Sequence, residues 1–177
     1  MKLYKLLYAL PILITFEFGF GNASAQDKSA DTTARYFVIQ ASIGNLQEVA
    51  MSRLAADQAT SPDLKAFATK MITDHSSAET QLMKLVQSKG LQIPKEATDP
   101  PVEDIMLKNT PSKDFDRVYV HMMVPDHRAA VALFEKYALT GKDPVVKAFA
   151  QATLPTLKEH LALIVSLEEK LKDAAAK

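Results

Sequence analysis

The sequence predicts an all-α protein in which four amphipathic helices form one bundle. Only three of its five glycines lie beyond residue 25, which argues against β-hairpins and glycine-rich phosphate loops. The pairs Ser61-Pro62 and Asp143-Pro144 each combine a helix-capping residue with a proline suited to the first helical turn. Apolar residues recur at helical spacing along four stretches of the chain. These features are typical of long helices joined by short turns.

Residues 1–25 have the pattern of a cleavable signal peptide. Two early lysines precede an apolar run over residues 6–16, and Ala23-Ser24-Ala25 supplies the small residues that a signal peptidase recognises. A membrane-spanning helix needs about 20 apolar residues, and Glu17 interrupts this run at about half that length. We therefore expect cleavage after Ala25, no stable membrane span in the mature chain, and a periplasmic or secreted location.

The composition of the mature chain limits what it can do. Residues 26–177 suffice for a single domain with its own core. The 21 basic and 21 acidic residues are interspersed, so no basic face for nucleic acid is expected. The chain has no cysteine, which excludes disulfides, thiolate catalysis, thiolate metal sites and iron–sulfur clusters.

The first two helices should form a tight hairpin. Ser29 or Asp31 can cap a first helix that runs to about residue 59. Ser61-Pro62 opens the second helix, and Gly90 is suited to its C-terminal cap. Because the connection between them is two or three residues long, the helices are expected to lie antiparallel.

A second hairpin follows the same plan. Its first helix should extend from near Pro111 to Gly141, and its second from Asp143-Pro144 to the alanine-rich tail. Residues 62–68 read PDLKAFA and residues 144–150 read PVVKAFA, each directly after a capping residue. A duplicated hairpin explains this likeness most simply.

The linker between the hairpins, about residues 91–110, is rich in proline and acidic residues. About 20 residues can span more than about 60 Å, whereas a helix of about 28 residues is only about 42 Å long. The linker can therefore cross the whole bundle, with one helical turn expected near residues 102–107. The sequence thus predicts a ferritin-like four-helix bundle built from two αα-hairpins joined by a long crossover linker.

One polar residue interrupts the apolar stripe of each helix near its middle. These residues are Glu48, His75, His127 and His160. At 1.5 Å per residue, all four lie about 16–24 Å from their hairpin turn, so they should share one layer. Burying a carboxylate and three imidazoles is costly unless they pair or share a cation. They would suit a single Zn²⁺, Fe²⁺ or Mn²⁺ ion.

Each of these residues also has a purely structural interpretation. The histidines can be satisfied core residues, with Glu48 paired to one of them. Asp74 can orient His75 or a neighbouring group, or can be a solvated charge. Asp116 and Tyr119, one turn apart, are expected to form a buried structural hydrogen bond. Pro155 should kink or bulge the last helix and rotate His160 away from its stripe.

The pattern resembles DUF4142, a family of exported bacterial ferritin-like proteins of unknown function. The matching features are Glu48, the pair Asp74-His75, Phe115-Asp116-x-x-Tyr119 followed by His127, and Pro155 with His160 five residues later. The resemblance covers about residues 33–171. It implies a ferritin-like fold and places these polar residues at family positions, and it implies no established activity.

The sequence departs from di-iron ferritin-like enzymes, which use a Glu on two helices and Glu-x-x-His on the other two. Ile72 and Leu157 stand where those glutamates would precede His75 and His160. A bridged di-iron centre is therefore not expected. The sequence also shows no nucleophile–base pair or cofactor motif, so we expect a binding protein rather than an enzyme.

Two functional hypotheses remain. In the first, an exported bundle binds one transition-metal ion (Zn, Fe or Mn) for storage, sensing or redox protection. In the second, a metal-free envelope or stress-related protein has a structural or interaction role, and its buried polar cluster only fixes helix packing. A protein partner and a homo-oligomer are compatible with both.

Overall fold

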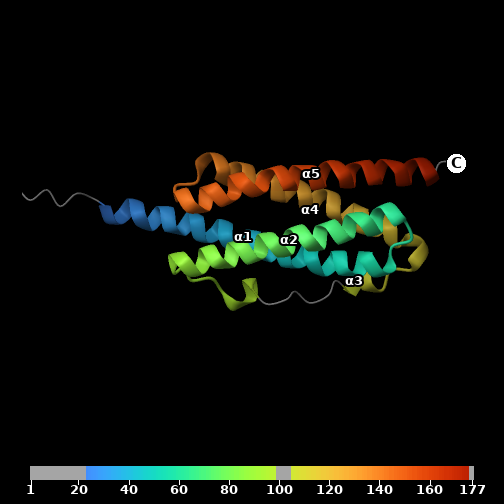
Figure 1. The fold of residues 1–177 in the computed structure, drawn as a ribbon, viewed down its shortest axis with the longest axis horizontal. Helices are drawn as coiled ribbons and strands as arrows, with labels where there is room; N and C mark the ends of the chain where they lie inside the picture. Colours follow the sequence, from blue (N-terminus) through green and yellow to red (C-terminus); the bar gives the residue numbers. More distant parts are fainter. Residues whose placement is uncertain (1–22, 99–104, 176–177) are drawn as a thin grey trace, which may run out of the picture.

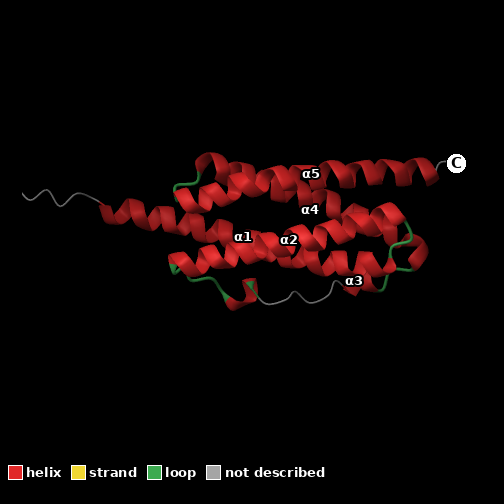
Figure 2. Cartoon of the chain, viewed as in Figure 1, coloured by secondary structure: helices red, strands yellow, loops and turns green. Residues whose placement is uncertain are grey.

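The computed structural model of the protein describes residues 23–98 and 105–175, and these form helices and loops without strands (Figure 2). The four long helices are α1 (Ala23–Gln58), α2 (Pro62–Lys89), α4 (Ser112–Thr140) and α5 (Pro144–Ala175). Two short pieces, η1 (Lys95–Ala97) and α3 (Ile105–Lys108), lie in the connection between α2 and α4. The predicted all-α class is confirmed.

The helices form two antiparallel hairpins that pack side by side, α1 with α2 and α4 with α5 (Figure 1). Between the hairpins, α1 packs against α4 and α2 packs against α5. The end of α2 and the start of α4 lie at opposite ends of the bundle (Figure 1). The predicted ferritin-like bundle with a crossover connection is confirmed.

None of the helices that the structure describes combines the length and the apolar character that a membrane span requires.

The second helix of each hairpin begins as predicted. Ser61 caps α2, where its Oγ accepts a hydrogen bond from the Leu64 N–H at 3.4 Å. Asp143 caps α5, where its Oδ1 accepts from Val145 and Val146 at 3.0 and 3.1 Å. The repeated PxxKAFA segments use their apolar positions alike, and the buried pairs are Leu64 and Val146, Phe67 and Phe149, and Ala68 and Ala150. The two hairpins therefore begin their second helices in the same way.

Two sequence-based expectations are corrected. The helix α1 begins at Ala23 and runs through Ser29 and Asp31, so neither residue caps it. The helix α5 is continuous through Pro155, so the bulge that was one of the two expected outcomes is absent there, and His160 stays fully buried. Most of the predicted signal peptide, residues 1–22, lies outside the described residues, so cleavage stays a prediction.

The core consists of two apolar clusters, one on either side of the predicted polar layer. Toward the α1–α2 turn, the cluster includes Met51, Leu64, Met71, Tyr119 and Ile164. Toward the other end of the bundle, it includes Phe37, Leu82, Phe134, Val146 and Leu157. Along every long helix the polar residue lies between the segments that build the two clusters. Burial at about 25 cal/mol per Å² in both clusters therefore fixes the depth of the polar layer.

The linker is anchored to the bundle at two points. The fully buried Ser42 Oγ donates to the Ala97 carbonyl at 2.7 Å, and Leu107 of α3 is fully buried in the core. Of the helical turn expected at residues 102–107, the part that the structure describes lies in α3. Two anchors on a long connection reduce the chain entropy that an untethered linker would keep.

Candidate metal centre

The four polar residues predicted for the centre meet in one buried layer. Glu48 comes from α1, His75 from α2, His127 from α4 and His160 from α5, and each is less than 5% exposed: 4%, 3%, 0% and 0%. The centroids of the three imidazole rings lie 5.2, 5.7 and 5.9 Å apart. One nitrogen of each ring lies within 4.8 Å of a nitrogen of the other two.

The His75 ring is held at its Nδ1 atom. This nitrogen lies 2.9 Å from Glu48 Oε2 and 3.0 Å from Asn45 Oδ1. Both partners accept hydrogen bonds, so Nδ1 carries the hydrogen and donates it to this pair. The Nε2 atom of His75 consequently presents a lone pair.

The other two rings are held in the same manner. His127 Nδ1 lies 3.0 Å from the Met123 carbonyl, which can only accept. His160 Nε2 lies 2.8 Å from Asp74 Oδ2. These nitrogens are therefore the donors, and His127 Nε2 and His160 Nδ1 keep their lone pairs.

The three remaining nitrogens are buried and unpaired. His75 Nε2, His127 Nε2 and His160 Nδ1 have no hydrogen-bond partner among the described residues. A buried polar atom without a partner costs about 1–3 kcal/mol. Three such lone pairs in one layer, each on a ring whose other nitrogen is fixed, form a set of donors suited to a cation.

The environment of His127 and His160 favours their neutral forms. Burial lowers the pKa of His160 to about 4, against the opposing effect of the Asp74 hydrogen bond. Burial also lowers the pKa of His127, although the Glu48 charge opposes it. Neutral imidazole is the form that binds metals, because one of its two nitrogens has no hydrogen and can donate its lone pair.

Glu48 and Asp74 are the carboxylates next to the rings. Burial alone would raise the pKa of Glu48, but its contacts with the neighbouring histidines, above all those with His75, lower it below the usual value. Glu48 Oε1 also lies 3.5 Å from His127 Nδ1. Asp74 contacts His160 and, at 3.1 Å, Lys70; these hydrogen bonds lower its pKa against the effect of burial. Asp74 thus orients a neighbouring histidine, His160, and not His75.

Asp116 and Tyr119 lie outside this centre and have separate structural roles. The Asp116 carboxylate accepts from Thr60 N and Thr60 Oγ1 at 2.8 and 2.7 Å and from Ser61 N at 2.8 Å, so it ties α4 to the α1–α2 turn. The Tyr119 hydroxyl shares a 2.8 Å hydrogen bond with Ser52. The hydrogen bond expected between Asp116 and Tyr119 is therefore replaced by these bonds.

The hydrogen-bond network behind His75 includes polar residues that were not predicted from the sequence. Asn45 Nδ2 donates to Glu79 Oε2 at 3.1 Å, and Ser42 Oγ contacts Glu79 Oε1 at 2.7 Å. Partial burial raises the pKa of the Glu79 carboxyl, against these bonds. Asn45 and Glu79 could have been predicted from helical spacing. Asn45 lies three residues before Glu48 and Glu79 lies four residues after His75, and residues three or four apart lie on the same face of a helix.

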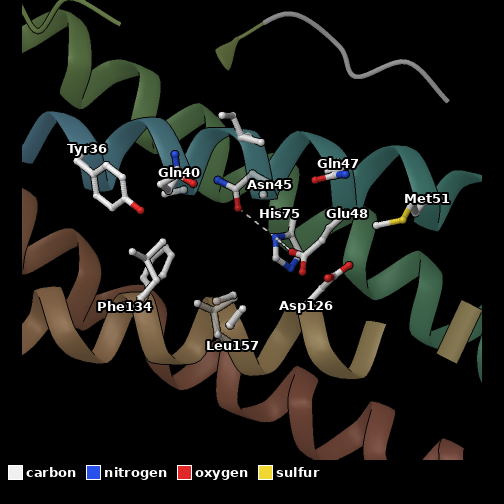
Figure 3. Close-up of a pocket in the computed structure, with 16 residues that line it drawn as sticks. Tyr36, Gln40, Asn45, Gln47, Glu48, Met51, His75, Asp126, Phe134 and Leu157 are labelled. Atoms are coloured by element: carbon white, nitrogen blue, oxygen red, sulfur yellow. Dashed lines mark hydrogen bonds and ion pairs between the residues drawn. The ribbon is translucent and has the colours of Figure 1, made fainter. Parts of the chain in front are cut away.

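A pocket of about 360 Å³ opens beside the centre, between α1 and α4, and its lining includes Glu48 and His75 (Figure 3). Asp126, on α4 next to His127, also lines it. Desolvation and the nearby Glu48 charge raise the pKa of the Asp126 carboxyl. Figure 3 shows Glu48 and Asp126 at one end of this pocket and Tyr36 and Phe134 at the other.

The fold is similar to two kinds of solved structure. CopM in its Cu(I)-bound form superposes with a TM-score of 0.66 at 16% identity, covering 78% of this chain and 96% of CopM. The Cu(II)-bound form of CopM gives 0.65 at 16% identity, covering 77% and 97%. A DUF305 fragment from Deinococcus radiodurans gives 0.66 at 14% identity, covering 78% and 96%. At these identities the likeness concerns the fold alone.

The sequence itself identifies a family. A search of curated proteins found no match to this sequence. A domain of unknown function, DUF4142, matches residues 21–167, which is most of the chain and includes all four residues of the buried layer. The protein therefore belongs to the DUF4142 family.

Proposed function

We propose that the bundle binds one transition-metal ion through His75 Nε2, His127 Nε2 and His160 Nδ1. The supporting observation is that all three nitrogens are buried and unpaired, while an acceptor fixes the opposite nitrogen of each ring. Metal-binding histidines commonly donate their second ring N–H to a carboxylate or a backbone carbonyl. Here Glu48, the Met123 carbonyl and Asp74 are those acceptors.

Glu48 fits an orienting role better than the ligand role expected from the sequence. Its oxygens lie at the Nδ1 atoms of His75 and His127, which are not the unpaired nitrogens of these rings. It would fix the rings and supply negative charge to a buried cation. Nitrogens bound to one tetrahedral ion at about 2.0–2.1 Å lie about 3.3 Å apart, which is within the 4.8 Å that bounds the separations of one nitrogen from each ring.

The donor set narrows the choice of metal. Imidazole ligands suit Zn, Cu, Fe and Ni, and Mn favours oxygen donors. Zn²⁺ and Fe²⁺ therefore fit better than the Mn²⁺ that the sequence also allowed. The bound copper in the two CopM structures supports testing copper as well. Three protein ligands leave one position for water or a small ligand. Storage, sensing or redox protection outside the cytoplasm are roles that such a centre would serve.

The metal-free alternative has one observation in its favour. The 2.9 Å contact between Glu48 and His75 can be an ion pair in which a proton on His75 balances the buried carboxylate. The layer would then only set the packing of the helices. This alternative leaves the unpaired nitrogens of all three histidines without an explanation.

The metal content of the mature protein tests the proposal. Residues 26–177 should be produced by export, purified without a histidine tag, and measured by elemental analysis. We expect about one equivalent of a transition metal, and its loss in the His75→Ala/His160→Ala variant. His121→Ala is the matched control, because His121 is an exposed histidine on α4 and its removal should change nothing.

Folding must be verified for each variant by circular dichroism. A folded wild-type protein that is isolated without metal, and takes up none of Zn²⁺, Fe²⁺, Mn²⁺ or copper, would overturn the proposal. The structural interpretation would then stand.

A further inference from the structure

The histidine layer is closed to solvent, so an ion needs a route to reach it. The rings of His75, His127 and His160 are at most 3% exposed. The pocket between α1 and α4 is lined by His75, a member of the layer whose Nε2 is unpaired. Among the three histidines the pocket is lined by His75, so it reaches the edge of the layer that this ring forms.

The two carboxylates of the pocket lie together. Glu48 and Asp126 lie next to His75, away from the aromatic rings of Tyr36 and Phe134 (Figure 3). Asp126 is exposed, whereas Glu48 is 4% exposed. No lysine or arginine is among the described residues that line the pocket. A cation moving inward would meet an exposed carboxylate first and a buried carboxylate next.

We infer that this pocket is the uptake route for the metal ion, with Asp126 as its outer carboxylate and Glu48 as its inner one. The inference rests on the proposed function. Clefts of one charge sign focus the field and raise the association rate of the opposite charge, by roughly 10- to 1000-fold for a complete cleft. Asp126 contributes to the rate of uptake and not to the ligands that hold the ion.

Asp126→Asn tests the charge. Chelator-stripped protein should be mixed with Zn²⁺ at low ionic strength, and uptake followed by stopped flow with a Zn²⁺ indicator. We expect the variant to bind the same amount of Zn²⁺ about three- to tenfold more slowly. The difference should shrink in molar salt, because charges are then screened within about 3 Å. Glu169→Gln is the control, since it removes one carboxylate from an exposed position on α5.

Gly44→Leu tests the path without changing charge. Gly44 lines the pocket, and a side-chain carbon built on it meets nothing within 4 Å, so a leucine begins there without a clash and adds apolar bulk to the pocket wall. The variant should fold, because leucine favours a helix more than glycine does. We expect a slower uptake of Zn²⁺, by tenfold or more, with an unchanged final amount.

The outcomes separate the two proposals. If wild-type protein takes up one equivalent and both variants do so at the wild-type rate, the route is wrong and the metal centre stands. If wild-type protein takes up none of Zn²⁺, Fe²⁺, Mn²⁺ or copper, even when refolded in their presence, the centre fails and the route fails with it. Slower uptake in both variants with full capacity would support the route.

Discussion

The core of this bundle accommodates polar side chains where the fold supplies a hydrogen-bond partner for each of them. Tyr119 is fully buried, and burial raises the pKa of its phenol well above the usual value, so the hydroxyl keeps its hydrogen. Ser52, also fully buried, supplies the partner at 2.8 Å. Because both side chains are fully buried, neither hydroxyl can replace this hydrogen bond with one to water.

A double-mutant cycle tests this pair. Tyr119→Phe leaves the Ser52 hydroxyl without its partner and should lower the free energy of unfolding by about 1–3 kcal/mol. In the Tyr119→Phe background, Ser52→Ala should lower the free energy of unfolding by less than it does in the wild-type protein, because it removes a hydroxyl that has already lost its partner. The difference between the two effects is the coupling energy, which we expect to be about 1 kcal/mol. Urea unfolding of the four proteins measures this coupling. Strictly additive losses would show that the hydrogen bond contributes nothing to stability.

At the scale of the helices, capping residues were the most reliable signals in the sequence. Ser61-Pro62, Asp143-Pro144 and Gly90 mark boundaries that the structure reproduces, and Gly90 adopts a φ of 61° that favours glycine. These signals are local, so the neighbouring residues suffice to specify them. The predicted start of α1 was wrong because Ser29 and Asp31 are acceptable within a helix, and no glycine or proline lies between Ala23 and Asp31.

Asp143 provides a pH-dependent test of one such cap. Although burial opposes it, the Lys89 contact and the N–H groups of α5 lower the pKa of Asp143 below its usual 3.8. A group whose pKa is lower in the folded state stabilises it above the unfolded value and loses that effect as the pH falls through the folded value. Asp143→Ala should cost about 1 kcal/mol at pH 7, typical of a lost cap.

The difference between wild type and Asp143→Ala should therefore close as the pH falls below about 4. Urea unfolding at intervals from pH 7 to pH 3 measures it. Ser61→Ala is the control, because the equivalent cap on α2 uses a hydroxyl that does not titrate in this range. A difference that is constant with pH would contradict the role of the Asp143 charge.

For the whole molecule, the sequence predicted the crossover bundle and the depth of the polar layer, because both follow from length and helical rise. The two apolar clusters then place Glu48, His75, His127 and His160 at one level. What could not be predicted was how each ring is oriented. The pairing of His160 with Asp74, and the position of Glu48 at the Nδ1 atoms, depend on how the hairpins pack, which no local pattern encodes.

The central claim is that three imidazoles bind one ion, and X-ray absorption spectroscopy of the Zn²⁺-loaded protein tests it most directly. We predict a first shell of three imidazole nitrogens and one further light atom at about 2.0–2.1 Å, without sulfur. The shell should lose imidazole scattering in His127→Ala and keep it in His121→Ala. A shell without imidazole scattering, or one that is unchanged in His127→Ala, would contradict the claim.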